Sequence, residues 1–239
     1  MKRFDQQTLF IVGGGSGMGA ELARQASAQG ARIALAGRRR ERLDTVAASL
    51  DGPVSVHPLD ISRRESLEAA LDEVGQVDHI VSTAADLTFK PFIELTDEDI
   101  QRTLDSKIWA SIQLGRAAHH YLAPKGSLLF YSGVAAYRPA PGASLVSSAN
   151  HWLEGIMNGL AVELAPRRVN VIFPGVVDSA TWDGMDESAR QTMFDETPRS
   201  LPVGRIGQVQ DLATAGLAIL ENGYIDAQVL HVDGGGRIA

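Results

Sequence analysis

The feature that most constrains the fold of this chain is a glycine-rich turn between a buried strand and a helix. Residues 8–12 read TLFIV, residues 13–19 read GGGSGMG, and apolar residues at helical spacing follow. In such a unit Gly13 permits a tight turn, Gly17 lets the backbone approach a pyrophosphate, and Gly19 lets the helix pack on the sheet. The N–H groups and the dipole at the helix N-terminus attract an anion. The unit therefore predicts a parallel sheet with a phosphate-binding edge.

Short apolar strands and helices alternate along the remaining chain. We expect further strands at 32–36, 54–59, 79–83, 128–132, 169–173 and 229–233. We expect a helix that ends at Gly52 and Pro53, helices opened by capping boxes at Ser62/Glu65 and Thr96/Asp99, a long helix from about Ser147 to Ala165, and a helix near 209–222. Parallel strands need such helical crossovers. The predicted fold class is α/β: a single domain, residues 1–239, with a Rossmann-type doubly wound parallel sheet of about seven strands.

Composition narrows the classes of partner. The chain has 239 residues, with 22 Lys and Arg against 29 Asp and Glu, which gives a net charge of −7. This charge argues against nucleic acid or an anionic membrane as the main partner and favours a small molecule. There is no cysteine and the six histidines lack zinc-ligand spacing, so we expect no metal site. The N-terminal sequence has no long apolar run, and we therefore expect a cytoplasmic protein without a signal peptide or membrane span.

The second expected strand ends in a cluster of cations. About twenty residues after the glycine turn, where a dinucleotide fold places an acid against the adenosine ribose, the chain has Gly37 followed by Arg38, Arg39 and Arg40. Three arginines at a helix N-terminus oppose the helix dipole, by up to ~1 kcal/mol each, unless an anion lies among them. A ribose 2′-phosphate is such an anion, which predicts NADP(H) rather than NAD(H). The alternative is a solvated basic turn that acidic residues of the same helix partly neutralise.

These motifs belong to a longer pattern. From Thr8 to Gly236 the chain resembles the short-chain dehydrogenase/reductase family, on the basis of GGGSGMG, AGRRRERL, LDIS at 59–62, ELAPRRVNVIFPG at 163–175, PVGRIG at 202–207 and the terminal VLHVDGG. The resemblance implies an NAD(P)-dependent oxidoreductase with a seven-stranded parallel sheet. It also implies a homodimer or homotetramer built on the fourth and fifth helices, and a substrate lid at about 178–207.

The resemblance further implies which residues hold the cofactor. Asp60 and Ile61 would contact adenine, and residues between 174 and 179 would line the nicotinamide. Together with the glycine turn, the arginine cluster and the end of the fourth strand, the predicted cofactor-binding set is Gly13, Gly15, Ser16, Gly17, Met18, Gly19, Gly37, Arg38, Arg39, Asp60, Ile61, Thr83, Ala84, Lys107, Asn150, Pro174, Gly175, Val177 and Ser179.

The catalytic residues of that family are missing from the corresponding positions. The family's chemistry depends on an asparagine in the fourth helix, a serine after the fifth strand, and a Tyr-x-x-x-Lys pair at the start of the fifth helix. In that order, these positions are taken here by Lys107, Gly133, Val146 and Asn150. The only formal Tyr-x-x-x-Lys, at 121–125, is interrupted by a proline and cannot lie on a continuous helix.

Helical geometry predicts where the substituted side chains lie. At ~100° per residue, Val146 and Asn150 share the apolar stripe of the fifth helix and face the usual active-site wall. Lys107 lies on the buried side of the fourth helix, where an unpaired ammonium is costly. Because the family's Asn and Lys are exchanged here, we expect Lys107 to reach the cofactor ribose from the opposite wall. The alternative is that its stem runs along the protein and places the ammonium in solvent.

Several side chains are candidates for the missing proton donor. A positioned acid contributes roughly 10² to 10⁴ in rate to a reaction such as carbonyl reduction, so its replacement matters. The candidates are Ser132, Tyr131, Lys107 and, as a weaker one, His151, or else a group of the substrate itself. Alternation along the fifth strand predicts that Tyr131 shares the face of Gly133 and that Ser132 is turned from it.

Two main hypotheses for function follow. The first is an NADP(H)-dependent oxidoreductase that acts on a small carbonyl or alcohol compound with degenerate catalytic residues. The second is a non-catalytic NADP(H)-binding protein that acts as a sensor or as a partner subunit. Non-redox chemistry in the same cleft, such as dehydration or isomerisation, is a third and weaker alternative.

Overall fold

The computed structural model describes residues 2–239, and its centre is a seven-stranded parallel sheet. The strand order is β3-β2-β1-β4-β5-β6-β9, and every neighbouring pair is parallel. The strands are β1 Thr8–Val12, β2 Arg32–Gly37, β3 Val54–Pro58, β4 Val77–Ser82, β5 Leu122–Tyr131, β6 Arg168–Pro174 and β9 Val229–Val232. This topology confirms the predicted single α/β domain with a doubly wound sheet.

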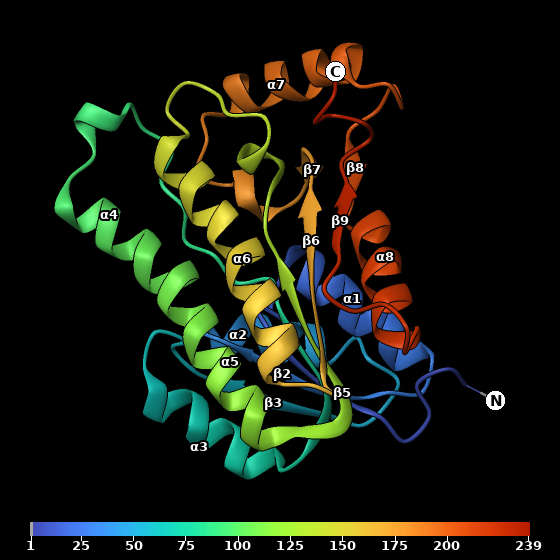
Figure 1. Ribbon diagram of the computed structural model, residues 1–239. Helices are drawn as coiled ribbons and strands as arrows, with labels where there is room; N and C mark the ends of the chain where they lie inside the picture. The colour runs from blue at the N-terminus through green and yellow to red at the C-terminus, as the bar shows by residue number, and fades with distance from the viewer. Residues whose placement is uncertain (1) are drawn as a thin grey trace.

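Helices cover both faces of the sheet (Figure 1). Helices α1, α2 and α8 contribute to one buried cluster, and α3, α5 and α6 contribute to the other. The helices are α1 Gly17–Ala28, α2 Arg40–Ala47, α3 Arg64–Val74, α4 Asp97–Thr103, α5 Ala110–Tyr121, α6 Ser144–Glu163, α7 Glu187–Ser200 and α8 Val209–Glu221. A π-helical segment, Leu104–Trp109, joins α4 to α5. Short 3₁₀ turns lie at Phe92–Glu94, Val134–Ala136 and Ala180–Trp182.

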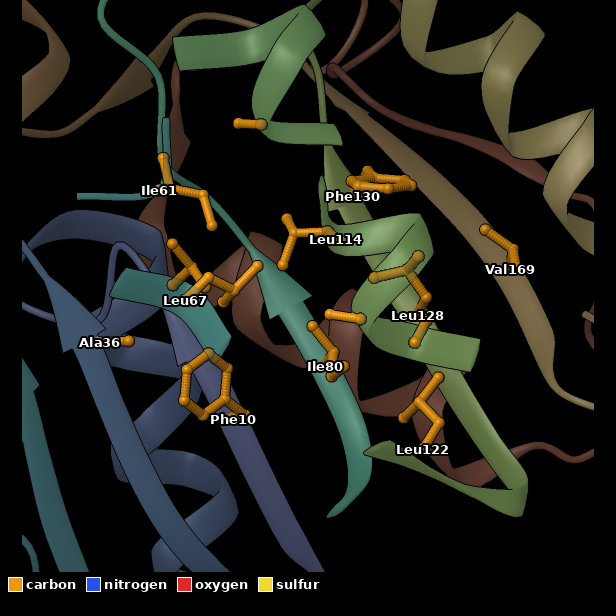
Figure 2. Packing of buried hydrophobic residues seen from close by; sticks show 14 of the residues in the cluster. Phe10, Ala36, Ile61, Leu67, Ile80, Leu114, Leu122, Leu128, Phe130 and Val169 are labelled. Carbon is orange, nitrogen blue, oxygen red and sulfur yellow. The ribbon is translucent and has the colours of Figure 1, made fainter. Parts of the chain in front are cut away.

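Alternation along the strands divides the core between the two faces. Phe10 points toward the cluster under α3, α5 and α6, whereas its neighbour Leu9 points toward the cluster under α1, α2 and α8. Figure 2 shows the first cluster, in which Phe10 and Ile80 from the strands lie near Leu67 of α3 and Leu114 of α5. Burial of both sheet faces explains why the strand sequences are almost continuously apolar.

The structure corrects several predicted boundaries. Helix α2 ends at Ala47 rather than at Gly52 and Pro53. The α-helical hydrogen-bond pattern gives way there to 3₁₀-type bonds between residues three apart: Ser49 N donates to Val46 O, and Leu50 N donates to Ala47 O. Helix α6 begins at Ser144, about one turn before the predicted start. Strand β5 begins at 122 rather than 128, because it pairs with β4 on both sides of a register shift.

Only one of the two predicted capping boxes forms. Thr96 accepts from Asp99 N and the Asp99 side chain accepts from Thr96 N, which confirms the box at the start of α4. The box predicted at Ser62 is wrong, because α3 begins only at Arg64. The Ser62 hydroxyl instead donates to Asp60 Oδ1 at 2.7 Å.

Two short parallel strands pair at the two ends of the segment that precedes α8. Strand β7, Val177–Asp178, pairs with β8, Gly207–Gln208. The chain between them carries α7, which lies across the carboxyl ends of the strands (Figure 1). The segment predicted as a lid, 178–207, is therefore anchored at both ends beside the sheet.

Candidate functional site

A cleft of 520 Å³ opens where β1, β2, β3 and β4 end. The segments that follow these four strands line it, together with one face of α4 and the 179–181 turn. The sheet order reverses between β1 and β4, and open α/β sheets bind ligands in the crevice outside the carboxyl ends of the strands at such a point. The fold thus places this cleft at a typical ligand site.

The glycine turn forms the floor of the cleft at the N-terminus of α1. Gly13 has φ +86°, and a Cβ there would lie 2.6 Å from Thr83 Oγ1. A Cβ at Gly19 would lie 2.5 Å from Gly13 O, so a larger residue would push α1 from the sheet. At Gly17 the nearest atom to a Cβ would be the Cβ of Ser179 at 3.7 Å, which leaves open space beside the helix N-terminus. This arrangement fits a phosphate group held by backbone N–H groups.

Two of the three predicted arginines face the cleft. Arg38 and Arg39 line it where β2 ends, and Arg38 Nη1 donates to Asp86 Oδ2 at 3.0 Å. Arg40 instead lies 3.6 Å from Asp44 one helical turn along α2 and is not part of the lining. Arg42 of α2 also lines the cleft, so three arginines lie near the position where an adenosine ribose would lie.

Most of the predicted cofactor-binding residues come together in this cleft. Those that line it are Gly13, Gly15, Ser16, Gly17, Met18, Gly37, Arg38, Arg39, Asp60, Ile61, Thr83, Ala84 and Ser179. Those outside its lining are Gly19, Lys107, Asn150, Pro174, Gly175 and Val177. Gly19 serves the packing of α1, and the other five belong to the region where the nicotinamide and substrate are expected.

Several residues that line the cleft were not predicted from the sequence. These are Val12, Arg42, Leu43, Leu59, Ser62, Ala85, Asp86, Glu98, Gln101, Arg102, Asp105, Ser106, Ala180 and Thr181. Four of them form a polar stripe on the helix after β4, at positions 98, 101, 102 and 105. That stripe has helical spacing and follows a strand at the switch point, so it was a usable signal.

The position of the family's tyrosine and lysine is buried and holds no ionisable side chain. Val146 and Asn150 are each 1% exposed, which confirms that this face of α6 points inward. Asn150 Nδ2 donates to Gly133 O at 3.2 Å, and a Cβ at Gly133 would lie 2.8 Å from that nitrogen. The Asn150 amide therefore occupies the space that a serine side chain at 133 would need.

The structure reverses the predicted orientations of Tyr131 and Ser132. The Tyr131 hydroxyl donates to Leu212 O at 2.9 Å on the α8 side of the sheet, and burial raises its pKa. Ser132 points toward α6, where its hydroxyl donates to Asn150 O at 2.9 Å. The alternation argument was wrong because β5 ends at Tyr131 and the chain then turns. The Tyr131 hydroxyl thus lies on the α8 side of the sheet, away from the α6 wall, and the Ser132 hydroxyl already has an acceptor.

Lys107 lies on the π-helical segment between α4 and α5 and is buried. It is 3% exposed, so the alternative of an ammonium in solvent is wrong. Burial lowers the pKa of this ammonium to about 7. The side chain borders a 10 Å³ cavity, which is just large enough for a water molecule. Ala84 and Ser106 line both this cavity and the cleft, so Lys107 lies directly behind the cleft wall.

Two aromatic side chains next to the cleft pack against each other. Phe89, in the segment after β4, and Trp182, in the predicted lid, have ring centroids 6.1 Å apart. Trp182 Nε1 donates to Val177 O at 2.9 Å, which fixes the indole against β7. These apolar side chains favour a ligand of mixed or apolar character.

Within residues 2–239, no three His, Asp or Glu side chains are grouped so that they could hold a metal ion. Over the same described range, none of the helices has the length and apolar character needed to cross a membrane.

Comparisons with known proteins agree with this geometry. The chain matches the family model described as enoyl-(acyl carrier protein) reductase over residues 13–236. It is 30% identical to the short-chain dehydrogenase/reductase malC of Malbranchea aurantiaca, over 96% of this chain and 94% of that protein. A short-chain dehydrogenase/reductase from Brucella melitensis, described as glucose/ribitol dehydrogenase, is 28% identical with a TM-score of 0.93 over 100% of both chains. A small-chain dehydrogenase in complex with NADPH is 28% identical with a TM-score of 0.86, over 98% of this chain and 100% of that one.

Proposed function

This chain belongs to the short-chain dehydrogenase/reductase family, and on that premise we propose that its cleft binds NADP(H) but supports little or no ordinary carbonyl reduction. One observation carries the proposal. The cleft keeps the glycine turn and two arginines, while the wall that should hold a proton donor is closed by Val146 and by the contact between Asn150 and Gly133.

The preference for NADP(H) over NAD(H) rests on charge at the end of β2. Gly37 stands where an acid would accept the ribose hydroxyls of NAD(H), and Arg38 and Arg39 follow it along the cleft. Guanidinium groups form charge-assisted hydrogen bonds to phosphate, which are about twice as strong as neutral ones. The neighbour solved with NADPH supports the same choice.

We also propose that Asn150 and Lys107 contact the nicotinamide ribose. The Asn150 Oδ1 acceptor is buried without a hydrogen-bond partner within residues 2–239, and a ribose hydroxyl would satisfy it. Lys107 lies behind Ala84 and Ser106, one layer from the cleft. An amine there could donate to the same ribose from the opposite wall.

Without a proton donor in the α6 wall, carbonyl reduction is expected to be slow. The nicotinamide group, when bound, supplies or accepts a hydride at a substrate carbon. A positioned acid normally delivers a proton to the substrate oxygen and contributes roughly 10² to 10⁴ in rate, or about 3 to 5 kcal/mol of barrier. Valine at 146 cannot do this. A sensor or a partner subunit in an oligomer needs the binding and not the proton transfer.

The second candidate function is an NADP(H)-dependent oxidoreductase of a small carbonyl or alcohol compound. The buried Lys107 favours it, because an amine with a pKa of about 7 can exchange a proton near neutral pH. In this reading Lys107 or a group of the substrate itself replaces the tyrosine, and Phe89 and Trp182 contact the substrate.

Calorimetry and a turnover screen separate the two candidates. Titration of the wild type with NADPH, NADP⁺, NADH and NAD⁺ at moderate salt should show tighter binding of the two phosphorylated forms. A broad screen of carbonyl compounds with NADPH and of alcohols with NADP⁺ should show little or no turnover. Equal affinity for NAD(H) would contradict the cofactor proposal, and robust turnover would establish the second candidate.

We further propose a homodimer or homotetramer through the face of α5 and α6. Trp152 and Val162 of α6 are 39% and 79% exposed, and Trp109 at the start of α5 is 41% exposed. A Cβ at Gly155 or Gly159 would contact nothing within 4 Å, so α6 also presents a smooth surface for close helix packing. Light scattering after size-exclusion chromatography should give a multiple of 25.6 kDa, and Val162→Glu should shift it toward the monomer.

A further inference from the structure

One carboxylate, that of Asp86, lies between two guanidinium groups at the cleft. Arg38 Nη1 is 3.0 Å from Asp86 Oδ2, and Arg102 Nε is 3.7 Å from Asp86 Oδ1. Arg38 belongs to the turn after β2, and Arg102 belongs to α4, so the carboxylate connects two sides of the cleft. All three side chains are part of its lining.

The two arginines are held very differently. Arg102 Nη2 donates to Thr88 Oγ1 and to Asp99 Oδ1, both at 2.8 Å. Hydrogen bonds from Lys90 and from the start of α4 lower the pKa of Asp99 to about 2, so that Asp99 stays charged. Arg38 is 66% exposed, and Asp86 is the one acid that it pairs with in the described chain, residues 2–239. Arg102 is therefore held in place by two further hydrogen bonds, whereas the Arg38 side chain can move away from Asp86 without losing another ion pair.

We propose that Asp86 sets how strongly the protein prefers NADP(H) over NAD(H), by holding Arg38 in an ion pair that the 2′-phosphate must replace. The inference rests on the proposed binding of NADP(H) in this cleft. A ligand with a free 2′-hydroxyl can bind without breaking the ion pair between Arg38 and Asp86. Arg102 continues to neutralise the carboxylate after Arg38 has moved, so the exchange leaves no unpaired acid.

The expected size of the effect follows from exposure. An ion pair between exposed side chains shifts an equilibrium by about fivefold at most, because water screens it. Removal of the Asp86 charge should therefore strengthen binding of a 2′-phosphorylated ligand by about three- to fivefold and leave binding of the unphosphorylated ligand unchanged.

The backbone at Asp86 is independent of the side-chain charge. Asp86 N donates to Ser106 Oγ at 3.0 Å, and Ser106 Oγ lies 3.2 Å from Asp86 O. Asp86→Asn keeps the shape of the side chain and these backbone contacts while it removes the charge. A change in ligand preference would then report on the ion pair and not on a displaced loop.

The probes are adenosine 2′,5′-diphosphate and adenosine 5′-monophosphate, which differ only in the 2′-phosphate. Calorimetry compares the full-length wild type with Asp86→Asn, Arg38→Ala and the double variant. Asp44→Asn is the matched control, because Asp44 lies in α2 just after the basic turn and its partner, Arg40, does not line the cleft. Thermal unfolding without ligand checks that each variant is folded.

The inference predicts a three- to fivefold gain for the diphosphate alone in Asp86→Asn, no gain when Arg38 is also absent, and no change in Asp44→Asn. It is overturned if Asp86→Asn weakens or strengthens both probes equally, which would mean that Asp86 contacts the nucleoside directly. It is also overturned if the gain persists without Arg38. If neither wild type nor Asp86→Asn binds the diphosphate or NADP(H), the proposed function fails and the inference fails with it.

Discussion

Lys107→Met is expected to stabilise the protein at neutral pH and to change how its stability depends on pH. Burial lowers the pKa of the Lys107 ammonium from 10.5 to about 7. The unfolded lysine keeps its ordinary pKa, so between these two values the unfolded state binds more protons than the folded state. Stability of the wild type therefore rises with pH through this window, and the full cost of the buried charge is present below about pH 7.

The size of the stability difference follows from the width of the pH range between the folded and the unfolded pKa of Lys107. Inside it, each pH unit adds up to about 1.4 kcal/mol to the free energy of unfolding, which gives a total of about 3 to 5 kcal/mol for one fully buried group. Methionine has a similar length and no charge, so it fills the same space beside the 10 Å³ cavity without a proton to lose. The variant should exceed the wild type in stability by several kcal/mol below about pH 7, and the difference should shrink steadily as pH rises from about 7 toward 10.5.

Urea unfolding of both proteins at several pH values between 6 and 10 gives this difference directly. All other titrating groups are shared and cancel when the two curves are subtracted. A difference that does not vary with pH would mean that the Lys107 ammonium is solvated or paired in the folded protein. That result would remove the physical basis for placing an exchangeable proton at this position.

Two further substitutions test the packing around the cleft and the sheet. Gly19→Ala should destabilise the protein by about 3 kcal/mol in thermal unfolding, because its Cβ would lie 2.5 Å from Gly13 O, whereas Gly184→Ala should change little because nothing lies within 4 Å there. Tyr131→Phe should cost about 1 kcal/mol of stability, because the hydroxyl bonds to Leu212 O, and should leave NADP(H) affinity and any turnover unchanged. Lost turnover at unchanged stability would instead restore Tyr131 as a proton donor.

The fold was predictable because its local signals agree with one another. The glycine turn at 13–19 lies between a buried strand and a helix, and Thr96 with Asp99 marks the start of α4 with both capping bonds present. At Ser62 the same sequence signal misled, because the Asp60 carboxylate two residues earlier accepts from the Ser62 backbone N–H, which the Glu65 carboxylate would accept in a capping box. A capping motif indicates which bonds are possible, and the neighbouring side chains decide which ones form.

The part of the site formed by backbone, the glycine turn, could be predicted from the sequence. The parts where side chains from distant segments meet could be predicted less well. Period-two alternation gave the wrong face for Tyr131, because the rule holds only while the strand continues and β5 ends at that residue. The pairing of Arg38 with Asp86 could not be read from the sequence, since these residues are 48 positions apart and meet only after β1 and β4 pair. Burial of Lys107 was predicted from helical spacing and is confirmed.

The central claim is that the cleft binds NADP(H) without a proton donor beside the reacting carbon. Its most direct test restores the family's residues together through Lys107→Asn, Gly133→Ser, Val146→Tyr and Asn150→Lys. The matched control carries Phe instead of Tyr at 146 and so lacks only the hydroxyl. The measurement is the steady-state rate of NADPH oxidation with a panel of carbonyl compounds, for both variants and the wild type.

We expect the tyrosine variant to oxidise NADPH roughly 10² to 10⁴ times faster than the phenylalanine control, and the wild type to be no faster than that control. Similar NADPH affinities in all three proteins would show that the gain lies in proton transfer. Wild-type turnover equal to that of the tyrosine variant would contradict the claim, because the unaltered cleft would then contain a working acid.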